Sequence, residues 1–185
     1  MVMSSRLRRA ALTIHIACSV GWLGAVGVFL ALAAVALTSQ DAQMVRAAYL
    51  VMEPVTRVVI VPTAVASLLS GVVQSLATPW GLFRHYWVIA KLVTTVLLSV
   101  LLLRYATTIS HLAGIAADPA TTITDLRPWG ASSAVHAGLA LMALLIPLVL
   151  SVFKPRGLTP YGARKTRSGT ADAAAPGAAH PHPPG

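Results

Sequence analysis

The feature that most constrains this chain is the run from Ala10 to Leu37, which contains no Asp, Glu, Lys or Arg. About 20 apolar residues in a helix are enough to cross the hydrocarbon core of a bilayer, and this run is longer. His15 is its one basic side chain. The whole chain is 56% hydrophobic and 10% charged, whereas soluble domains have roughly 25% charged residues. The sequence therefore predicts a membrane protein.

Three further apolar segments follow the first. The four predicted spans are residues 10–37, 52–77, 86–109 and 131–153. Because a helix satisfies its own backbone hydrogen bonds inside lipid, we expect an all-α integral membrane protein. Its domain, residues 10–156, should be a four-transmembrane-helix bundle. Pro54 and Pro62 should kink the second helix, since proline lacks a backbone donor.

Polar segments lie between and outside these spans. Residues 1–9 should form a basic tail. Residues 157–185, which are basic and rich in Ala and Pro, should form a disordered tail because they lack apolar side chains to pack.

Polar connections are predicted at residues 38–51 and 111–130. In the first of these, Ser39 or Asp41 can cap a helix that continues into the second span.

Charge placement predicts the orientation. With the amino terminus inside, the cytoplasmic side holds nine Lys and Arg residues: three in residues 1–9, Arg84, and five from Lys154 to Arg167. The other side holds two, Arg46 and Arg127. Positive residues mark the cytoplasmic side, so we expect a multi-pass plasma-membrane protein with both termini in the cytoplasm. The first apolar run is about twice as long as the 7–15 residues of a signal peptide, which favours an uncleaved helix.

The partners expected from this pattern are lipids. The basic residues cluster beside the spans, so the formal charge of +9 acts as a topology signal and does not indicate nucleic-acid binding. A homo-oligomer or a membrane-complex partner stays open. Ala17, Gly21 and Ala25 form a ridge of small residues on the first span, a pattern that serves helix packing in membranes.

The few polar residues within the spans fall into two layers. Each intramembrane charge costs about 2.5–3.5 kcal/mol on insertion scales, so it needs a partner or a role. An inner layer is predicted to contain His15, Ser70, Gln74 and Lys91. Thr63, Ser67, Ser70 and Gln74 should share one face of the second helix. The simpler alternatives are that Lys91 reaches the interface and that a neighbouring hydroxyl or carbonyl satisfies His15.

The outer layer is predicted to contain Glu53, Arg57, Arg104, His111 and His136. Glu53 and Arg57 are spaced to pair along a helix. Arg104 has no evident acidic partner, so either it reaches outward to the interface or a ligand carboxylate pairs with it.

Three short motifs carry a resemblance. They are His15 followed by Trp22 and Gly24, the segment HYWVIAKLVTTVLL from His85 to Leu98, and the ending SVFKPRG. In span order and motifs the chain resembles the four-helix membrane proteins related to the CopD copper-resistance domain. It is also similar to the HemJ type of protoporphyrinogen oxidase. The resemblance implies haem b, with His15 as an iron ligand and Lys91 as a binding or catalytic residue. The outer arginines lie outside this pattern.

Three functions remain open at this point. The first is a haem b-binding protein with a redox role, using His15 and Lys91 as an inner site, or His136, Arg57 and Arg104 as an alternative outer site that pairs with propionates. The second is a small transporter or ion-handling protein, since intramembrane His and Lys suit proton relays. The third is a non-catalytic accessory subunit of a membrane complex. The resemblance alone supports an oxidoreductase, and the sequence leaves open whether the protein is an enzyme.

Overall fold

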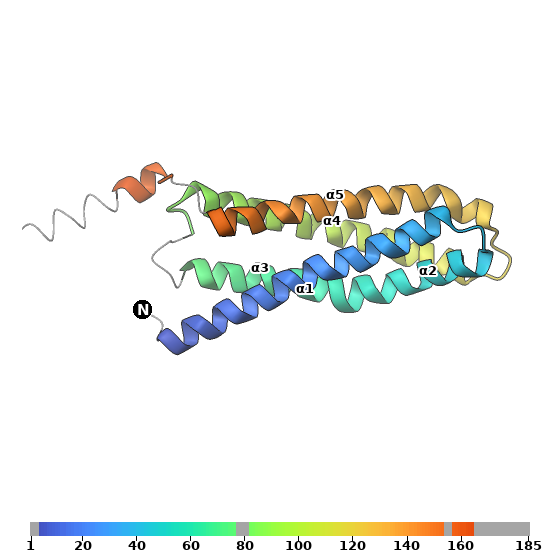
Figure 1. Ribbon diagram of the computed structural model, residues 1–185, viewed down its shortest axis with the longest axis horizontal. Helices are drawn as coiled ribbons and strands as arrows, with labels where there is room; N and C mark the ends of the chain where they lie inside the picture. Colours follow the sequence, from blue (N-terminus) through green and yellow to red (C-terminus); the bar gives the residue numbers. More distant parts are fainter. Residues whose placement is uncertain (1–3, 77–81, 154–156, 165–185) are drawn as a thin grey trace, which may run out of the picture.

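The described residues contain four long helical rods, which lie side by side as a bundle (Figure 1). The computed structural model describes residues 4–76, 82–153 and 157–164. The elements in chain order are α1 (Ser5–Thr38), α2 (Ala42–Pro54), η1 (Val55–Ile60), α3 (Val61–Leu76), α4 (Tyr86–Ala117) and α5 (Ile123–Phe153). Segments α2, η1 and α3 follow one another without a break and form one rod. Four helices in the described residues are long and apolar enough to cross a membrane, which confirms the predicted all-α membrane fold.

Local chemistry sets where the first two rods begin. The Ser4 hydroxyl accepts a hydrogen bond from the Leu7 backbone N–H at 3.4 Å. The Asp41 carboxylate accepts one from the Gln43 N–H at 2.8 Å, as expected for a residue that caps a helix. Of the two predicted caps, Asp41 is therefore the one at the helix start. Residues 5–9 of the predicted basic tail are helical and belong to α1.

The second rod is irregular between its two prolines. Val55–Ile60 forms a π-helix, η1, in the stretch between Pro54 and Pro62. Because each proline lacks a backbone N–H, it interrupts the regular α-helical hydrogen bonds. In this rod the interruption takes the form of a wider π-helical turn. The Thr56 hydroxyl donates to the Met52 carbonyl at 2.8 Å.

The predicted polar loop at residues 111–130 is wrong. Helix α4 continues to Ala117 and α5 begins at Ile123, so the connection is only residues 118–122. The missed signal is a helical apolar spacing, because Ile109, Leu112 and Ala116 are all buried in the core. Polar residues on the opposite face keep this part of the helix amphipathic.

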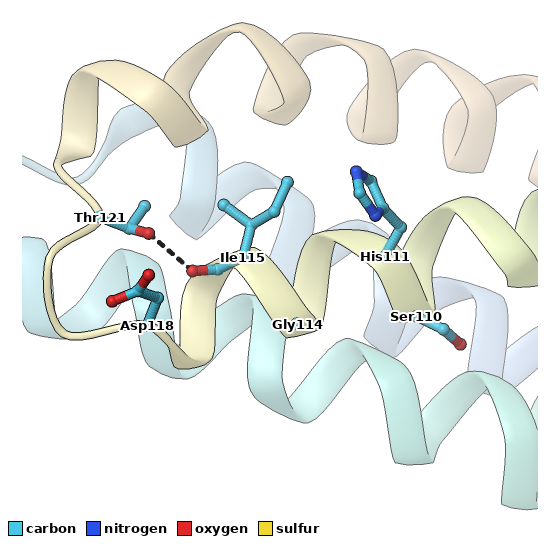
Figure 2. A pocket seen from close by; sticks show the side chains of 6 residues that line it. All are labelled: Ser110, His111, Gly114, Ile115, Asp118 and Thr121. Atoms are coloured by element: carbon cyan, nitrogen blue, oxygen red, sulfur yellow. Dashed lines mark hydrogen bonds between the residues drawn. The ribbon is translucent and has the colours of Figure 1, made fainter.

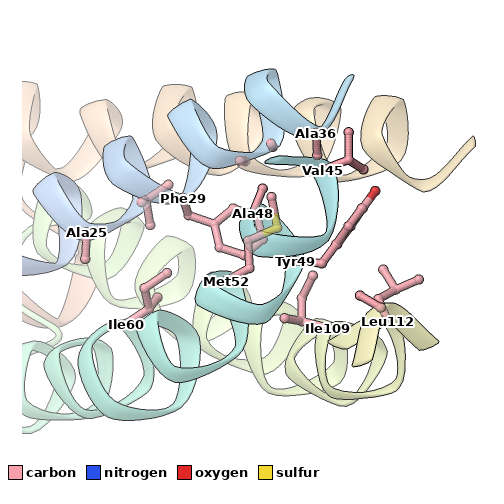
Figure 3. Packing of buried hydrophobic residues seen from close by; sticks show 14 of the residues in the cluster. Ala25, Phe29, Ala36, Val45, Ala48, Tyr49, Met52, Ile60, Ile109 and Leu112 are labelled. Carbon is pink, nitrogen blue, oxygen red and sulfur yellow. The ribbon is translucent and has the colours of Figure 1, made fainter. Parts of the chain in front are cut away.

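Packing divides the bundle into two halves. We call residues 22–60 and 102–138 the Tyr49 half, and residues 5–21, 61–76, 86–101 and 139–153 the His15 half. The largest fully buried apolar side chains all belong to the Tyr49 half, and they are Tyr49, Met52, Ile109, Leu112, Leu126 and Val45. Figure 3 shows Tyr49 and Met52 between α1 and α4. In the His15 half, by contrast, no residue in 5–21 of α1 or 145–153 of α5 is buried.

Two contacts define the Tyr49 half. The buried Tyr49 hydroxyl donates to the Leu126 carbonyl at 3.1 Å. Helices α1 and α5 approach so closely that a Cβ at Gly130 would lie 3.1 Å from the Leu37 Cα. Glycine is needed there because a backbone cannot move aside as a side chain can.

The outer surface of α4 locates the lipid. Its exposed residues are apolar from Val93 to Leu103 and polar from Arg104 to His111. Tyr86 to Arg104 spans about 27 Å at the helical rise, which matches a hydrocarbon core of about 30 Å. The rods have 31 to 35 residues and are therefore about 46–52 Å long. The part of the Tyr49 half nearest the connections at residues 39–41 and 118–122 therefore extends beyond the apolar band.

Residues 157–164 are ordered against the start of α4. Leu158 forms an antiparallel bridge with His85, and the Thr159 N–H donates to the Arg84 carbonyl at 3.0 Å. The Thr159 hydroxyl donates to the Phe83 carbonyl at 2.6 Å. We call this segment the C-terminal strap. The prediction of disorder is wrong for it, because main-chain hydrogen bonds need no apolar composition. Residues 165–185 lie outside the described residues.

Candidate functional site

His15 lies between α1 and α3 and bonds across to α3. Its Nδ1 is 3.1 Å from the Ser67 carbonyl oxygen and 3.1 Å from the Ser70 hydroxyl. A carbonyl can only accept, so Nδ1 carries the proton and Nε2 of the neutral ring keeps a free lone pair. Nε2 makes no hydrogen bond to any described residue. The simpler alternative was that a neighbouring carbonyl or hydroxyl satisfies His15. This holds for Nδ1, whereas Nε2 stays available to bind a ligand.

A glycine makes room for this ring. A Cβ at Gly71 would lie 3.0 Å from the His15 Cε1 atom, tighter than an ordinary contact. Gly71 lies on the same helix as Ser67 and Ser70. Helix α3 thus supplies the space for the imidazole as well as its hydrogen-bond acceptor.

More polar groups extend this contact along the two helices. The hydroxyls of Ser19 and Ser67 are 2.7 Å apart. The Gln74 Oε1 atom is buried without a hydrogen-bond partner among the described residues. Together with His15 and Ser70 they form what we call the α1–α3 polar cluster. Of the predicted polar face of the second span, Ser67 and Ser70 thus meet α1. The Thr63 methyl group also lies on the side of α1, while its hydroxyl donates to the Val59 carbonyl of the same rod.

Lys91 lies at the same end of the bundle, on α4. Its Nζ donates to the Ser151 hydroxyl of α5 at 3.1 Å and lies 4.7 Å from the centre of the Trp87 ring, within cation–π range. Lys91 thus contacts α5 and the Trp87 ring, one turn nearer the helix start. Sequence reasoning missed Ser151, which an apolar helix end does not single out.

The ridge of small residues on α1 is used inside the bundle. A Cβ at Gly21 would lie 3.7 Å from the Thr63 methyl group of α3, and Ala25 is buried. Ala17 is exposed. Gly21 and Ala25 therefore serve contacts within the chain.

The outer candidates do not converge. Arg57 forms an ion pair with Glu53 at 3.1 Å, with the two side chains 62% and 36% exposed. Its Nη2 donates to Ser110 of α4 at 2.9 Å. Arg104 is exposed. Within the described residues, we find no contact that joins Arg57, Arg104 and His136 into one site.

His136 belongs to a separate aromatic contact. Its ring stacks on Tyr105, with centroids 4.6 Å apart and planes 13° apart. Its Nδ1 is 2.7 Å from the carbonyl of Ser132 one turn earlier. The Tyr105 hydroxyl donates to Ser133 at 2.9 Å. His136 is exposed on α5, so its ring is held by its own helix and one neighbouring aromatic.

Two hollows in the described part of the chain bear on the candidate residues. One, of about 430 Å³, lies on the surface of α4 near its end and is lined by Ser110, His111, Gly114, Ile115, Asp118 and Thr121. Figure 2 shows Ser110 and His111 pointing to different sides of α4, so their polar groups do not meet. The other, of about 110 Å³, lies inside the bundle and is lined by all four rods, including Trp22, Tyr105 and His136.

These features limit what could be bound. No group of three or more His, Cys, Asp or Glu side chains that could hold a metal ion occurs in the described residues. Haem needs only one or two protein ligands, because the porphyrin supplies the others. The donor chemistry of His15 fits an axial ligand, since metal-bound histidines usually donate their other N–H to a carbonyl or carboxylate. The interior cavity, of about 110 Å³, is far smaller than the 300–1,000 Å³ usual for ligand sites, so it does not fit a porphyrin.

Comparison with known proteins gives no relative. No protein-family model, no curated protein and no solved structure matches this chain. Fold and site together define a class, a four-helix membrane protein with a histidine–serine cluster between α1 and α3 and a lysine–serine contact between α4 and α5.

Proposed function

We propose that this protein binds haem b in its His15 half and has a redox role, as its resemblance to the CopD-related and HemJ-type proteins implies. The observation that carries the proposal is the contact of His15 Nδ1 with the Ser67 carbonyl at 3.1 Å. It fixes the tautomer in which Nε2 is free to ligate iron. The clearance above Gly71 lets the ring keep this orientation.

Lys91 supports the same proposal from the opposite pair of helices. An ammonium at this depth can pair with a haem propionate or a substrate carboxylate. Ser151 holds it at 3.1 Å. Haem, when bound, supplies one-electron chemistry at iron, while these residues bind and orient it. Lys91 is also the candidate for any catalytic role.

The middle of the bundle argues against the transport alternative. Between the α1–α3 polar cluster and Tyr105, the residues facing the interior are mainly apolar, including Trp22, Leu98 and Leu144. A proton or ion path needs polar groups or water along its length. The apolar middle therefore separates the polar groups of the His15 half from Tyr105 and the polar groups beyond it. A non-catalytic accessory subunit needs none of these contacts and is the outcome if no cofactor binds.

Absorption spectroscopy tests this proposal. The protein, expressed with added haem precursor and purified in mild detergent, should show a Soret band that His15→Ala removes or shifts. Added imidazole should restore a band in that variant, because it replaces the missing ligand. His136→Ala is the matched control and should leave the band intact. Loss of the band in His136→Ala alone would move the site to the Tyr49 half, and a wild type without a band would refute haem binding.

We further propose a plasma-membrane location with both termini in the cytoplasm. The support is the split of nine to two basic residues described above and the positive-inside rule. Arg6, Arg9 and Arg84 flank one end of the bundle, and Arg127 lies near the other. A reporter enzyme that works only in the cytoplasm should be active when it is fused after Gly185. Activity of a reporter that works only outside the cell would refute this orientation.

A further inference from the structure

We propose that the interior cavity holds the hydrocarbon chain of a membrane lipid, which enters from the bilayer between α4 and α5. The cavity is separate from the α1–α3 polar cluster, because His15 is not among the residues that line it. The inference therefore does not depend on haem binding.

The position of the cavity makes it reachable from lipid. It is lined by Trp22 and Phe29 of α1, by Leu98 and Tyr105 of α4, and by Leu144 of α5. These α4 positions lie within or at the edge of the apolar band that runs from Tyr86 to Arg104. Leu98 and Leu144 are near the middle of this band, and Tyr105 is at its polar boundary. The cavity thus runs along about 10 Å of helix, within one leaflet.

Its mouth lies between α4 and α5. Leu101 and His136 both line the cavity, and both are exposed on the outer surface, Leu101 to 55%. At the deep end, Trp22 is only 3% exposed. A chain that enters past Leu101 would therefore end at the Trp22 ring.

The lining selects hydrocarbon over water. Most of its polar groups already have partners: Thr56 donates to Met52, Tyr105 donates to Ser133 and His136 Nδ1 contacts the Ser132 carbonyl. The Trp22 indole N–H and His136 Nε2 are the remaining polar groups of the lining, too few to hold a chain of water molecules. A buried water needs two to four polar partners, and an apolar cavity of about 150 Å³ stays dry yet binds benzene. The cavity here, about 110 Å³, therefore suits the end of an acyl or isoprenoid chain. An empty cavity would forfeit those dispersion contacts.

Fluorescence quenching by brominated lipids tests the proposal. The full chain with Trp22 as its only tryptophan (Trp80, Trp87 and Trp129→Phe) is reconstituted into phosphatidylcholine vesicles with chains brominated near the terminal methyl. Bromine quenches indole on contact, so Trp22 emission should fall by about twofold relative to unbrominated vesicles. Ala140→Phe, which places a ring in the cavity, should abolish the loss. Leu139→Phe is the matched control, because Leu139 is 66% exposed and does not line the cavity, and it should keep the loss.

Two further measurements keep the test decisive. If Ala140→Phe fails to fold, Leu144→Ala enlarges the cavity and should increase the quenching by terminal bromines. Acrylamide, a water-soluble quencher, should have little effect on Trp22. Equal emission in brominated and plain vesicles would overturn the proposal. Strong quenching by acrylamide would also overturn it, because the cavity would then be a water path.

Discussion

The Tyr49 half and the His15 half are made from the same four rods, yet they are held together differently. In the Tyr49 half, large side chains such as Tyr49, Met52 and Leu126 are completely buried, as in the core of a soluble bundle. In the His15 half, polar contacts join the helices in pairs, α1 with α3 through His15 and α4 with α5 through Lys91. Burial of large apolar side chains thus stabilises the Tyr49 half, whereas hydrogen bonds determine which helices pair in the His15 half.

The difference follows from what surrounds each half. Inside lipid there is no hydrophobic force between helices, so close packing and polar contacts must hold them together. The part of the Tyr49 half beyond the apolar band meets water or headgroups, where burial of apolar surface is favourable. The candidate functional groups therefore occur where packing is loosest, which is also where a ligand could enter.

The largest expected effect comes from removing a core side chain of the Tyr49 half. Met52 is 0% exposed, and Met52→Ala should destabilise the protein by about 2–5 kcal/mol. Leu69 on α3 is 61% exposed, so Leu69→Ala should change stability by less than about 0.5 kcal/mol. Thermal or denaturant unfolding in detergent, followed by circular dichroism, measures both. Equal losses would show that the two halves are packed alike.

Two glycines sharpen the comparison. Gly130→Ala forces a Cβ against the backbone of Leu37, which should cost about 1–3 kcal/mol as overpacking. Gly71→Ala meets only the movable His15 ring, so its stability loss should be smaller. It should instead displace Nδ1 from the Ser67 carbonyl, seen as a changed histidine signal in nitrogen-15 NMR. A Gly71→Ala protein with an unchanged histidine signal would show that the ring does not depend on this clearance.

A pair of hydroxyl deletions should have intermediate effects. Tyr49→Phe leaves the Leu126 carbonyl without its buried donor and should cost about 0.5–1.5 kcal/mol. Ser19→Ala removes the 2.7 Å contact with Ser67 and should cost about 0.6 kcal/mol, the average for polar contacts between membrane helices. Chemical denaturation of both variants in the same detergent ranks them. A larger loss for Ser19→Ala would reverse the assignment of stability to the Tyr49 half.

Truncation should give the smallest effect. A chain that ends at Arg164 keeps the C-terminal strap and should unfold at the wild-type temperature. A chain that ends at Arg156 loses the hydrogen bonds of Thr159, with an expected cost of about 1 kcal/mol. Differential scanning fluorimetry resolves such a shift. If both truncations behave like the wild type, the strap does not contribute to stability.

The apolar runs were enough to predict the four spans, because crossing a membrane demands length and hydrophobicity. They could not predict how far the helices continue outside it. Ile109, Leu112 and Ala116 follow a helical spacing, but polar residues such as Ser110 and His111 lie between them. Because the segment as a whole is polar, its composition indicated a loop. The strap was missed for a related reason, since Thr159 donates from its N–H and its hydroxyl to the carbonyls of Arg84 and Phe83, and every sequence possesses such carbonyls.

For the candidate site, helical spacing correctly placed Ser70 at the level of His15, since the Ser70 hydroxyl lies 3.1 Å from the His15 Nδ1 atom. It could not predict that the Ser67 carbonyl is the acceptor, since carbonyls are common to all residues. It also grouped Arg57 and His136 by depth alone. Depth fixes the height of a residue along a bundle but not the direction in which its side chain points.

The contacts of α1 imply an order of assembly during synthesis. His15 meets Ser67, 52 residues later in the chain, whereas Leu37 meets Gly130 only after three spans have been made. His15 can thus form its hydrogen bond as soon as the second rod has inserted. The end of α1 near Leu37 completes its packing only after α5 has inserted. A ribosome-bound intermediate with two rods should already protect His15, while its loop-proximal end remains open to a membrane chaperone or to lipid.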